Sequence, residues 1–229
     1  KVLVLAEKPS VGRDLARVLD CKNDKNWYIE GEKYIVTWAL GHLVTLADTE
    51  SYDIRYKSWS MEDLPIIPTS FKTIVIKKTS KQFNTVKSQM LRNDVSEIVI
   101  ATDAGREGEL IFPPPPPMCG CKKPIERLWI SSMEEKAIRE GFAQLKPGTD
   151  YDDLYSSALC RQQADWLVGI NGTRLFTVLY RSKVLKVGRV QTPTLAMIVN
   201  RESEIMNFKK EPYYSVELQM GNLVATSTK

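Results

Sequence analysis

The strongest constraint on the fold of this chain is the alternation of short aliphatic segments with helical patterns. Each aliphatic segment has the length of a strand, and the segments are residues 2–5 (VLVL), 73–76 (TIVI), 97–101 (EIVIA) and 127–130 (RLWI). Helical patterns follow three of them, at residues 11–19, 80–91 and 131–142. Unbroken aliphatic strands that alternate with helices are typical of a mostly parallel sheet covered on both faces. The sequence therefore predicts an α/β fold with flanking helices.

Three further patterns refine this outline. Residues 34–44 (YIVTWALGHLV) predict one or two additional strands, and residues 49–70 predict a long polar and aromatic loop. Ser132 and Glu135 have the spacing of a capping box at the start of a helix. Gly141 is expected to end that helix.

The chain changes character after residue 148. Apolar residues recur with a helical period over residues 150–180. A second helix is predicted over residues 191–205, with Thr192 as its N-cap, and an alternating strand over residues 213–220. We therefore divide the chain into an α/β domain, a mainly helical segment and the start of a further domain, at residues 1–148, 149–210 and 211–229.

Composition leaves the class of partner open. The 229 residues include 32 Lys and Arg against 28 Asp and Glu, which gives a formal net charge of +4. Such an excess permits a nucleic-acid partner without requiring one. The four cysteines form no CxxC pair, so we interpret them as thiols of a reducing compartment. No apolar stretch approaches ~18 residues, and we expect a cytoplasmic protein without a membrane association.

Carboxylates follow two of the predicted strands. Glu7 comes after the first strand, and Asp103 comes after the strand at residues 97–101. In doubly wound sheets, ligands collect beyond the carboxyl ends of the strands, so the two groups are expected at one edge. Glu107 follows Asp103 by about one helical turn and can point to the same place.

Three converging carboxylates would suit a magnesium ion, which takes hard oxygen ligands and keeps positions free for phosphate. Lys8 and Arg106 add positive charge that could hold a phosphodiester. Phosphoryl transfer is therefore the predicted reaction class. Taken singly, each acidic residue is equally explained as a helix N-cap or as a partner of the helix dipole. The catalytic interpretation depends on their combination with Lys8 and Gly105.

Five blocks of this sequence, in order, resemble type IA DNA topoisomerases of the topoisomerase III branch. Two of them, VLVLAEKPSVGRDLA and IVIATDAGREGELI, are similar to the Toprim domain of that family, which has a Rossmann-like fold. The others are WALGHLVTLAD, RQQADWLVGINGTRLF and VGRVQTPTLAMIVNRE. The resemblance implies that Glu7, Asp103 and Glu107 are metal-binding or acid–base carboxylates. It also implies that Lys8 contacts the scissile phosphate with Arg106 in support. Many family members carry Asp-x-Asp-x-Glu, whereas this chain has Gly105 at the middle position.

The helical segment carries further candidates for DNA binding. Arg161, Asp165 and Gly169 recur every four residues and share one helix face. A surface ion pair between Arg161 and Asp165 is the alternative, but with arginine first this order is the weaker one. The resemblance implies that this face is part of a groove for single-stranded DNA, within a groove-forming domain at residues 149–210 that precedes an arch domain. It also implies roles in DNA binding for His42, Arg189 and Gln191.

The resemblance implies a Mg²⁺-dependent, ATP-independent enzyme that cuts one DNA strand through a tyrosine and passes another strand. None of the nine tyrosines lies in the family's Tyr-x-Arg-Thr setting. We therefore expect this chain to be an N-terminal portion, monomeric, that binds metal and single-stranded DNA but does not cleave. The alternatives are another Toprim enzyme, such as a primase or nuclease, and a non-catalytic nucleic-acid-binding module. The segment PPPPP at residues 113–117 replaces a helix that relatives are expected to have, and proline in a helix interior costs about 3 kcal/mol.

Overall fold

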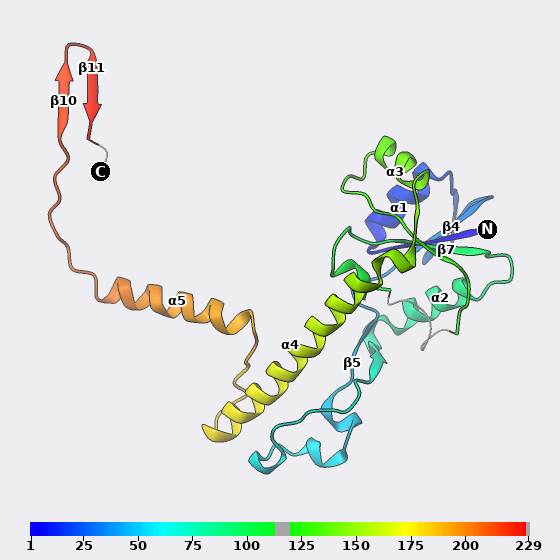
Figure 1. Ribbon diagram of the computed structural model, residues 1–229, viewed down its shortest axis with the longest axis horizontal. Helices are drawn as coiled ribbons and strands as arrows, with labels where there is room; N and C mark the ends of the chain where they lie inside the picture. Colours follow the sequence, from blue (N-terminus) through cyan, green and yellow to red (C-terminus); the bar gives the residue numbers. More distant parts are fainter. Residues whose placement is uncertain (113–119, 228–229) are drawn as a thin grey trace.

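The computed structural model describes residues 1–112 and 120–227. A compact α/β region contains the N-terminus, and the long helix α4 (Asp152–Leu179) projects from it. Helix α5 (Gln191–Met206) and a hairpin of strands β10 (Glu217–Met220) and β11 (Leu223–Thr226) continue as an arm away from the compact region (Figure 1). The predicted helices over residues 150–180 and 191–205 are therefore present.

Seven strands of the described chain form one sheet, in the order β2-β3-β4-β1-β7-β8-β9. Strand β1 lies at its centre and pairs in parallel with β4 and β7, and β7 pairs in parallel with β8. The outer strands β2, β3 and β9 are antiparallel to their neighbours. The predicted α/β fold with a mostly parallel sheet is confirmed. The strand bounds are β1 Val2–Ala6, β2 Asn23–Asp24, β3 Tyr28–Glu30, β4 Tyr34–Trp38, β7 Glu97–Ala101, β8 Ile125–Arg127 and β9 Lys146–Pro147.

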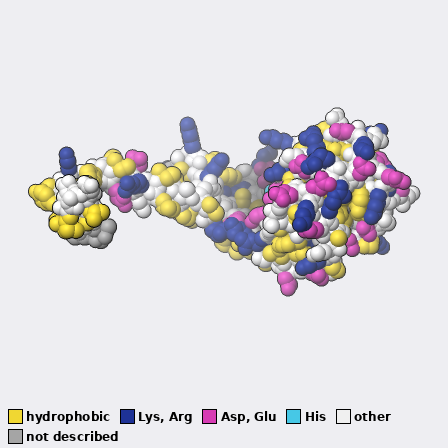
Figure 2. Space-filling model, turned by 90° about the horizontal axis from the view of Figure 1, so that it is seen from above, with side chains coloured by type: hydrophobic (Ala, Val, Ile, Leu, Met, Phe, Trp, Pro, Cys, Tyr) yellow, Lys and Arg dark blue, Asp and Glu magenta, His cyan; other side chains and the backbone are white. Residues whose placement is uncertain are grey.

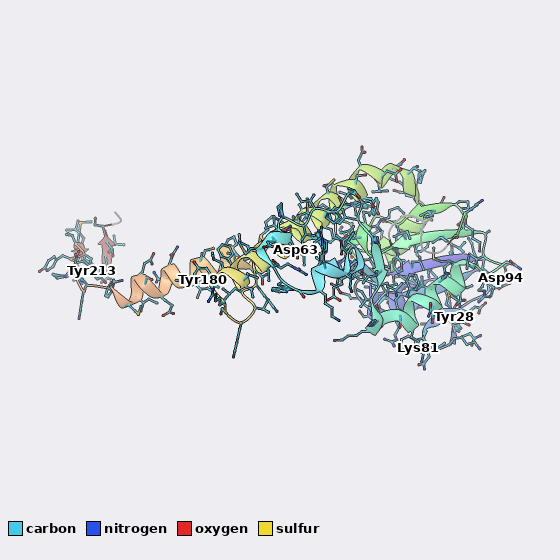
Figure 3. The ribbon with its side chains drawn as sticks, turned by 90° about the horizontal axis from the view of Figure 1, so that it is seen from below. Tyr28, Asp63, Lys81, Asp94, Tyr180 and Tyr213 are labelled. Carbon is cyan, nitrogen blue, oxygen red and sulfur yellow. The ribbon has the colours of Figure 1, made fainter. Side chains whose placement is uncertain are left out.

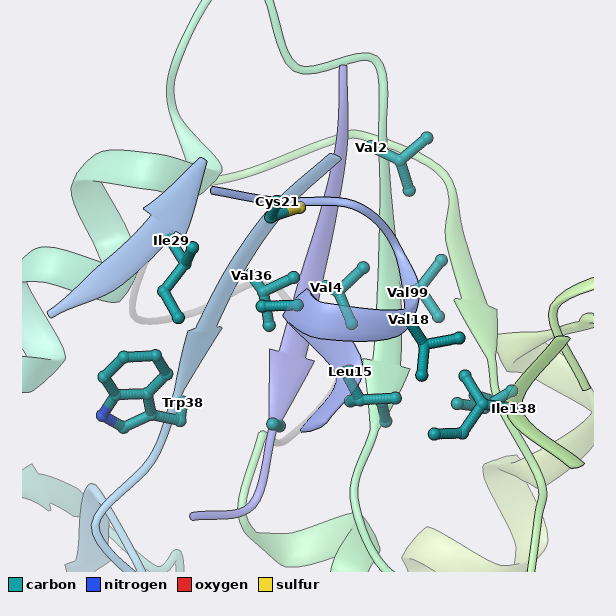
Figure 4. Packing of buried hydrophobic residues seen from close by; sticks show 14 residues of the cluster. Val2, Val4, Leu15, Val18, Cys21, Ile29, Val36, Trp38, Val99 and Ile138 are labelled. Atoms are coloured by element: carbon teal, nitrogen blue, oxygen red, sulfur yellow. The ribbon is translucent and has the colours of Figure 1, made fainter. Parts of the chain in front are cut away.

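The sheet has a hydrophobic core on each face. Successive side chains of a strand point to opposite faces, so in β1 Val4 packs into one core and Leu3 and Leu5 pack into the other. Helices α1 (Pro9–Val18) and α3 (Glu135–Phe142) supply the first core, where Leu15 and Ile138 are fully buried (Figure 4). Helix α2 (Ser80–Met90) supplies the second core. Burial on both faces explains why the central strands are continuous aliphatic runs.

Close packing of α1 on the sheet depends on a glycine. A Cβ atom at Gly12 would lie 2.5 Å from Cε3 of the Trp38 ring in β4. Such a separation is too short for two carbon atoms, whose optimal contact lies near 3.5–4.0 Å. Gly12 therefore lets α1 pack closely against β4. The neighbouring strand, β1, ends one residue before Glu7.

Two of the four predicted strands differ from the prediction. The strand predicted at residues 127–130 is β8, which ends at Arg127, and the segment at residues 73–76 differs more. Strand β6 (Thr73–Val75) lies outside the main sheet and pairs in antiparallel fashion with β5 (Val44–Leu46). Thr73 and Ile74 are exposed and Val75 is partly buried, whereas every residue of β1 is buried. Lysines flank this short run on both sides, at Lys72 and Lys77, so it suits a partly solvated pair of strands better than a core that is buried on both faces.

Two predicted helix caps are also corrected. The N-cap of α3 is Glu134, and the Ser132 hydroxyl accepts a hydrogen bond from the Glu134 N–H at 3.3 Å. Helix α5 begins at Gln191, and the Thr192 hydroxyl accepts from the Gly188 N–H at 3.0 Å. The Ser132 hydroxyl closes a turn just before α3, and the Thr192 hydroxyl closes a turn across the start of α5. Short polar side chains often bind nearby backbone groups in this way instead of capping a helix.

A structured loop packs along α4. The loop spans residues 47–72 and contains three short 3-10 helices, η1 Thr49–Ser51, η2 Ile54–Lys57 and η3 Met61–Asp63. Asn171 of α4 accepts from the Ile66 N–H at 2.6 Å and donates to the Ile66 carbonyl at 2.9 Å. Trp166 donates its indole N–H to the Ala47 carbonyl at 3.1 Å. These contacts hold α4 against the loop that extends from the α/β region (Figure 1).

The arm beyond α4 is exposed and rich in apolar side chains, whereas charges of both signs are mixed over the visible face of the compact region (Figure 2). No described helix combines the length and apolar character needed to span a membrane. The domain boundaries after residues 148 and 210 stay predictions. The prediction about residues 113–117 lies outside the described residues.

Candidate active site

Glu7 and Asp103 lie at the carboxyl ends of two adjacent parallel strands. The register pairs Ala6, the last residue of β1, with Ala101, the last residue of β7. Glu7 is the next residue in its strand direction, and Asp103 follows two residues after Ala101. The Asp103 backbone N–H donates a hydrogen bond to Glu7 Oε2 at 3.1 Å. The fold therefore brings together two residues that are 96 positions apart in the sequence.

Glu107 is directed toward the helical half of the molecule. Its Oε1 atom lies 3.8 Å from Arg161 Nε in α4. Both residues line a cavity of about 180 Å³ together with His42 and Asp165. Gln162, Leu110 and Ala158 complete its lining. Four of the predicted site residues therefore converge at the junction of α4 with the sheet edge.

Asp165 forms a bidentate ion pair with Arg189. Arg189 Nε lies 2.6 Å from Asp165 Oδ1, and Arg189 Nη2 lies 3.2 Å from Oδ2. Hydrogen bonding from the Arg189 guanidinium lowers the pKa of the Asp165 carboxyl below its ordinary value. The pair connects α4 to the segment that leads into α5.

Gly169, on the same face of α4, lies against the backbone at Val187. A Cβ atom there would lie 3.6 Å from the Val187 carbonyl oxygen. The Val187 N–H donates to the Thr173 hydroxyl at 2.9 Å. The backbone that approaches this face is thus residues 187–188 of the same chain, and it places Arg189 beside Asp165.

The other predicted site residues lie at the surface around this edge. Lys8 is exposed and is the N-cap residue of α1. Arg106 is exposed in the turn between Asp103 and Glu107. Gln191 is exposed at the first position of α5, and its side chain lies against Gly188. The described contacts do not join these three residues to the Glu7–Asp103 pair.

The donor set suits a magnesium ion in part. Mg²⁺ prefers hard oxygen ligands and commonly takes one or two direct carboxylates with water in its remaining positions. Glu7 and Asp103 supply that chemistry at one edge of the sheet. Within residues 1–112 and 120–227, however, no group of three His, Cys, Asp or Glu side chains lies close enough to hold a metal ion. The convergence of Glu7, Asp103 and Glu107 on one ion stays a prediction.

A buried ion pair beneath the acidic turn was not anticipated from the sequence. Arg127 of β8 and Glu109 are joined at 2.8 Å, with side-chain exposures of 2% and 10%. Arg127 also donates to the backbone carbonyls of Thr102 and Asp103. A charged residue among the apolar residues of a predicted buried strand is the one sequence signal that could have indicated this pair.

Two protein-family models match different parts of this chain. A family model for the Toprim domain matches residues 2–112, and a model described as DNA topoisomerase matches residues 149–229. The chain is 60% identical over 222 residues to DNA topoisomerase 3 of Bacillus thuringiensis (strain Al Hakam), which covers 97% of this chain and 30% of that protein. It is 58% identical over 226 residues to DNA topoisomerase 3 of Bacillus subtilis (strain 168), covering 99% of this chain and 31% of that protein.

A solved structure shares the fold. Full-length topoisomerase I from Thermotoga maritima superimposes with a TM-score of 0.61 at 21% identity, over 98% of this chain and 34% of that chain. The sheet order and the acidic edge define a Toprim-domain protein. Since the helical half is matched as well, the chain belongs to the type IA DNA topoisomerases, in the topoisomerase III branch. It spans about 30% of the length of the DNA topoisomerase 3 relatives described above.

Proposed function

We propose that this chain supplies the Toprim domain and part of the DNA-binding groove of an ATP-independent DNA topoisomerase III. The observation that carries the proposal is the junction where the Glu7–Asp103 edge meets the cavity lined by Glu107, Arg161 and Asp165. A strand of DNA that lies along α4 would place a phosphodiester beside the carboxylates. The enzyme would act in the cytoplasm as a monomer on single-stranded DNA.

The cationic and polar residues of the site would bind the DNA. Arg161 and Arg189 carry guanidinium groups that can hold backbone phosphates along α4. Lys8 and Arg106, both exposed beside the acidic edge, would orient the scissile phosphate and offset the charge that develops on its oxygens. His42 and Gln191 would contribute further DNA contacts. Arg161 lines the cavity and Arg189 binds Asp165 at its wall, so positive charge is available close to Glu107.

The carboxylates would serve two purposes. Glu7 and Asp103, with Glu107, are the residues that would hold Mg²⁺, and the bound ion would neutralise phosphate charge in the site. Toprim domains generally bind this ion. Glu7 would also exchange a proton with the oxygen that leaves or re-enters the phosphodiester, because it is a carboxylate beside the predicted position of the phosphate. Covalent attachment of the strand to a tyrosine conserves the bond energy, so religation needs no ATP.

The nucleophile is expected elsewhere in the full-length protein. The family setting Tyr-x-Arg-Thr does not occur among the 229 residues. Tyr213, in the arm, lies far from the sheet and is 90% exposed (Figure 3). We therefore expect residues 1–229 alone to bind single-stranded DNA in the presence of Mg²⁺ without nicking or relaxing it.

A pair of assays tests the proposal. Purified residues 1–229 should bind a fluorescent single-stranded oligonucleotide, and Arg161→Ala should weaken that binding, whereas Arg139→Ala on the remote surface of α3 should not. A full-length protein that carries this chain should relax negatively supercoiled plasmid with Mg²⁺ and without ATP, and Glu7→Gln or Asp103→Asn should abolish turnover. Plasmid nicking by residues 1–229 alone, or full turnover by the Asp103→Asn protein, would overturn the proposal. Full turnover by the Asp103→Asn protein is the result expected if this chain is only a nucleic-acid-binding module and catalysis takes place elsewhere in the full-length protein.

A further inference from the structure

The buried arginine beneath the acidic turn makes more contacts than an ion pair requires. Arg127 is 1% exposed and donates to four backbone carbonyls in addition to Glu109. Its Nη1 atom lies 3.1 Å from the Ile100 oxygen, 2.9 Å from the Thr102 oxygen and 2.8 Å from the Leu128 oxygen. Its Nη2 atom lies 2.8 Å from the Asp103 oxygen. Three of the four carbonyls belong to the end of β7 and the turn that follows it.

These contacts fix the peptide groups on both sides of the Asp103 side chain. The Asp103 N–H donates to Glu7 Oε2 at 3.1 Å, while its carbonyl accepts from Arg127 and from the Gly105 N–H. The same carbonyl is enclosed on a further side, because a Cβ atom at Gly108 would lie 2.2 Å from it. Because the peptide groups on both sides of Asp103 are held, the direction of its Cα–Cβ bond, and hence of its side chain, is fixed.

A second hydrogen bond closes the turn. The Thr102 hydroxyl donates to the Gly108 carbonyl at 3.0 Å within the buried part of the turn. Gly108 begins the 3-10 helix η5 (Gly108–Leu110), which contains Glu109, and Glu109 binds Arg127 Nε. Arg127 therefore holds both ends of the segment that carries Asp103 and Glu107.

Stability alone is a poor explanation for this arrangement. The desolvation cost of a buried ion pair often cancels its attraction, so such pairs are weak contributors to stability. A planar guanidinium presents five N–H donors in a fixed fork, which suits the satisfaction of several converging carbonyls. Trp129 and Tyr151 stack on each other with centroids 4.8 Å apart, and both rings lie within 6 Å of the guanidinium carbon. These rings limit the freedom of Arg127 further.

We propose that Arg127 is a positioning residue that acts through the backbone of Thr102 and Asp103 to orient the metal-binding carboxylates. This inference rests on the proposed function, since it assumes that Asp103 binds a divalent cation. Arg127 does not itself contact the ion or the DNA. Outer partners that orient metal ligands typically change metal affinity 10–100-fold when they are replaced.

The test measures Mn²⁺ binding to residues 1–229 by electron paramagnetic resonance, with Mn²⁺ as a probe for a hard-oxygen site. We expect Arg127→Lys, which keeps the charge but loses the fork, to weaken binding about tenfold or more. Arg139→Lys is the matched control, because Arg139 also binds a glutamate at 2.8 Å but on the surface. Thr102→Val keeps Arg127 and removes only one hydrogen bond of the turn, and should weaken binding about two- to tenfold.

Circular dichroism melts decide which variant is informative. If Arg127→Lys is unfolded at the assay temperature, Glu109→Gln decides the question, because it keeps an acceptor for Arg127 Nε but removes the counter-charge that holds the guanidinium in place. Weaker binding in a folded variant, with Arg139→Lys at the wild-type value, supports the positioning role. Wild-type affinity in the folded variants would overturn that role while leaving the metal site intact. Failure of the wild-type chain to bind Mn²⁺ would overturn the proposed metal site, and the positioning role with it.

Discussion

Removal of the Glu109 carboxylate should destabilise the fold far more than removal of a surface carboxylate with the same pairing distance. Glu109→Ala leaves the Arg127 guanidinium buried without its counter-charge. Breaking a buried pair in this way typically costs 3–5 kcal/mol. Because four backbone carbonyls still accept hydrogen bonds from Arg127, we expect the lower end, about 3 kcal/mol. For a chain of this size, such a loss lowers Tm by roughly 6–12 °C.

Glu135→Ala provides the matched control. The Arg139–Glu135 pair has the same 2.8 Å separation as Arg127–Glu109, but its side chains are 61% and 53% exposed. Exposed pairs contribute at most about 1 kcal/mol. Urea unfolding followed by circular dichroism measures both variants. If Glu109→Ala costs no more than Glu135→Ala, burial does not control the strength of these pairs, and the reasoning about Arg127 fails.

Three further outcomes are expected. Gly105→Asp should be accepted without loss of stability and should tighten Mn²⁺ binding measured by calorimetry, because a Cβ atom there meets nothing within 4 Å; unchanged affinity would show that this position does not reach the ion. Gly12→Ala should destabilise the fold by about 1–3 kcal/mol in urea unfolding, because its Cβ would lie 2.5 Å from the Trp38 ring; a neutral effect would mean that α1 is free to move. Arg189→Ala should raise the pKa of Asp165, followed by NMR titration. The pair's stabilisation is present above the ordinary value of 3.8 and is lost as the pH falls through the lowered pKa, so a variant that is equally destabilised at all pH values would contradict this.

The sequence predicted the centre of the fold well, for a physical reason. The β1 and β7 segments are buried on both faces, and a continuous aliphatic run is typical of a central strand of a parallel sheet. The segment at residues 73–76 has a similar pattern, but it became strand β6 of a separate, partly exposed pair. Such a short apolar run does not specify its partner strand, and tertiary contacts determine which strand it pairs with.

The sequence identified the residues of the candidate site better than it predicted the contacts between them. Residues after strand ends could be placed at one edge because parallel strands share their direction. The Glu7 contact with Asp103 follows from that rule. The contact between Glu107 and Arg161 depends on how α4 crosses the edge, and local patterns contain no information about that crossing. Likewise, the position of Gly169 on the helix face does not indicate that the Val187 carbonyl lies against it.

The central claim is that Glu7 and Asp103 bind one divalent cation at the shared edge of β1 and β7. Anomalous scattering from crystals of this chain grown with Mn²⁺ tests it most directly. The account predicts a peak within coordination distance, about 2.0–2.2 Å, of carboxylate oxygens from both residues. A peak that contacts neither residue, or no peak at saturating Mn²⁺, would contradict it.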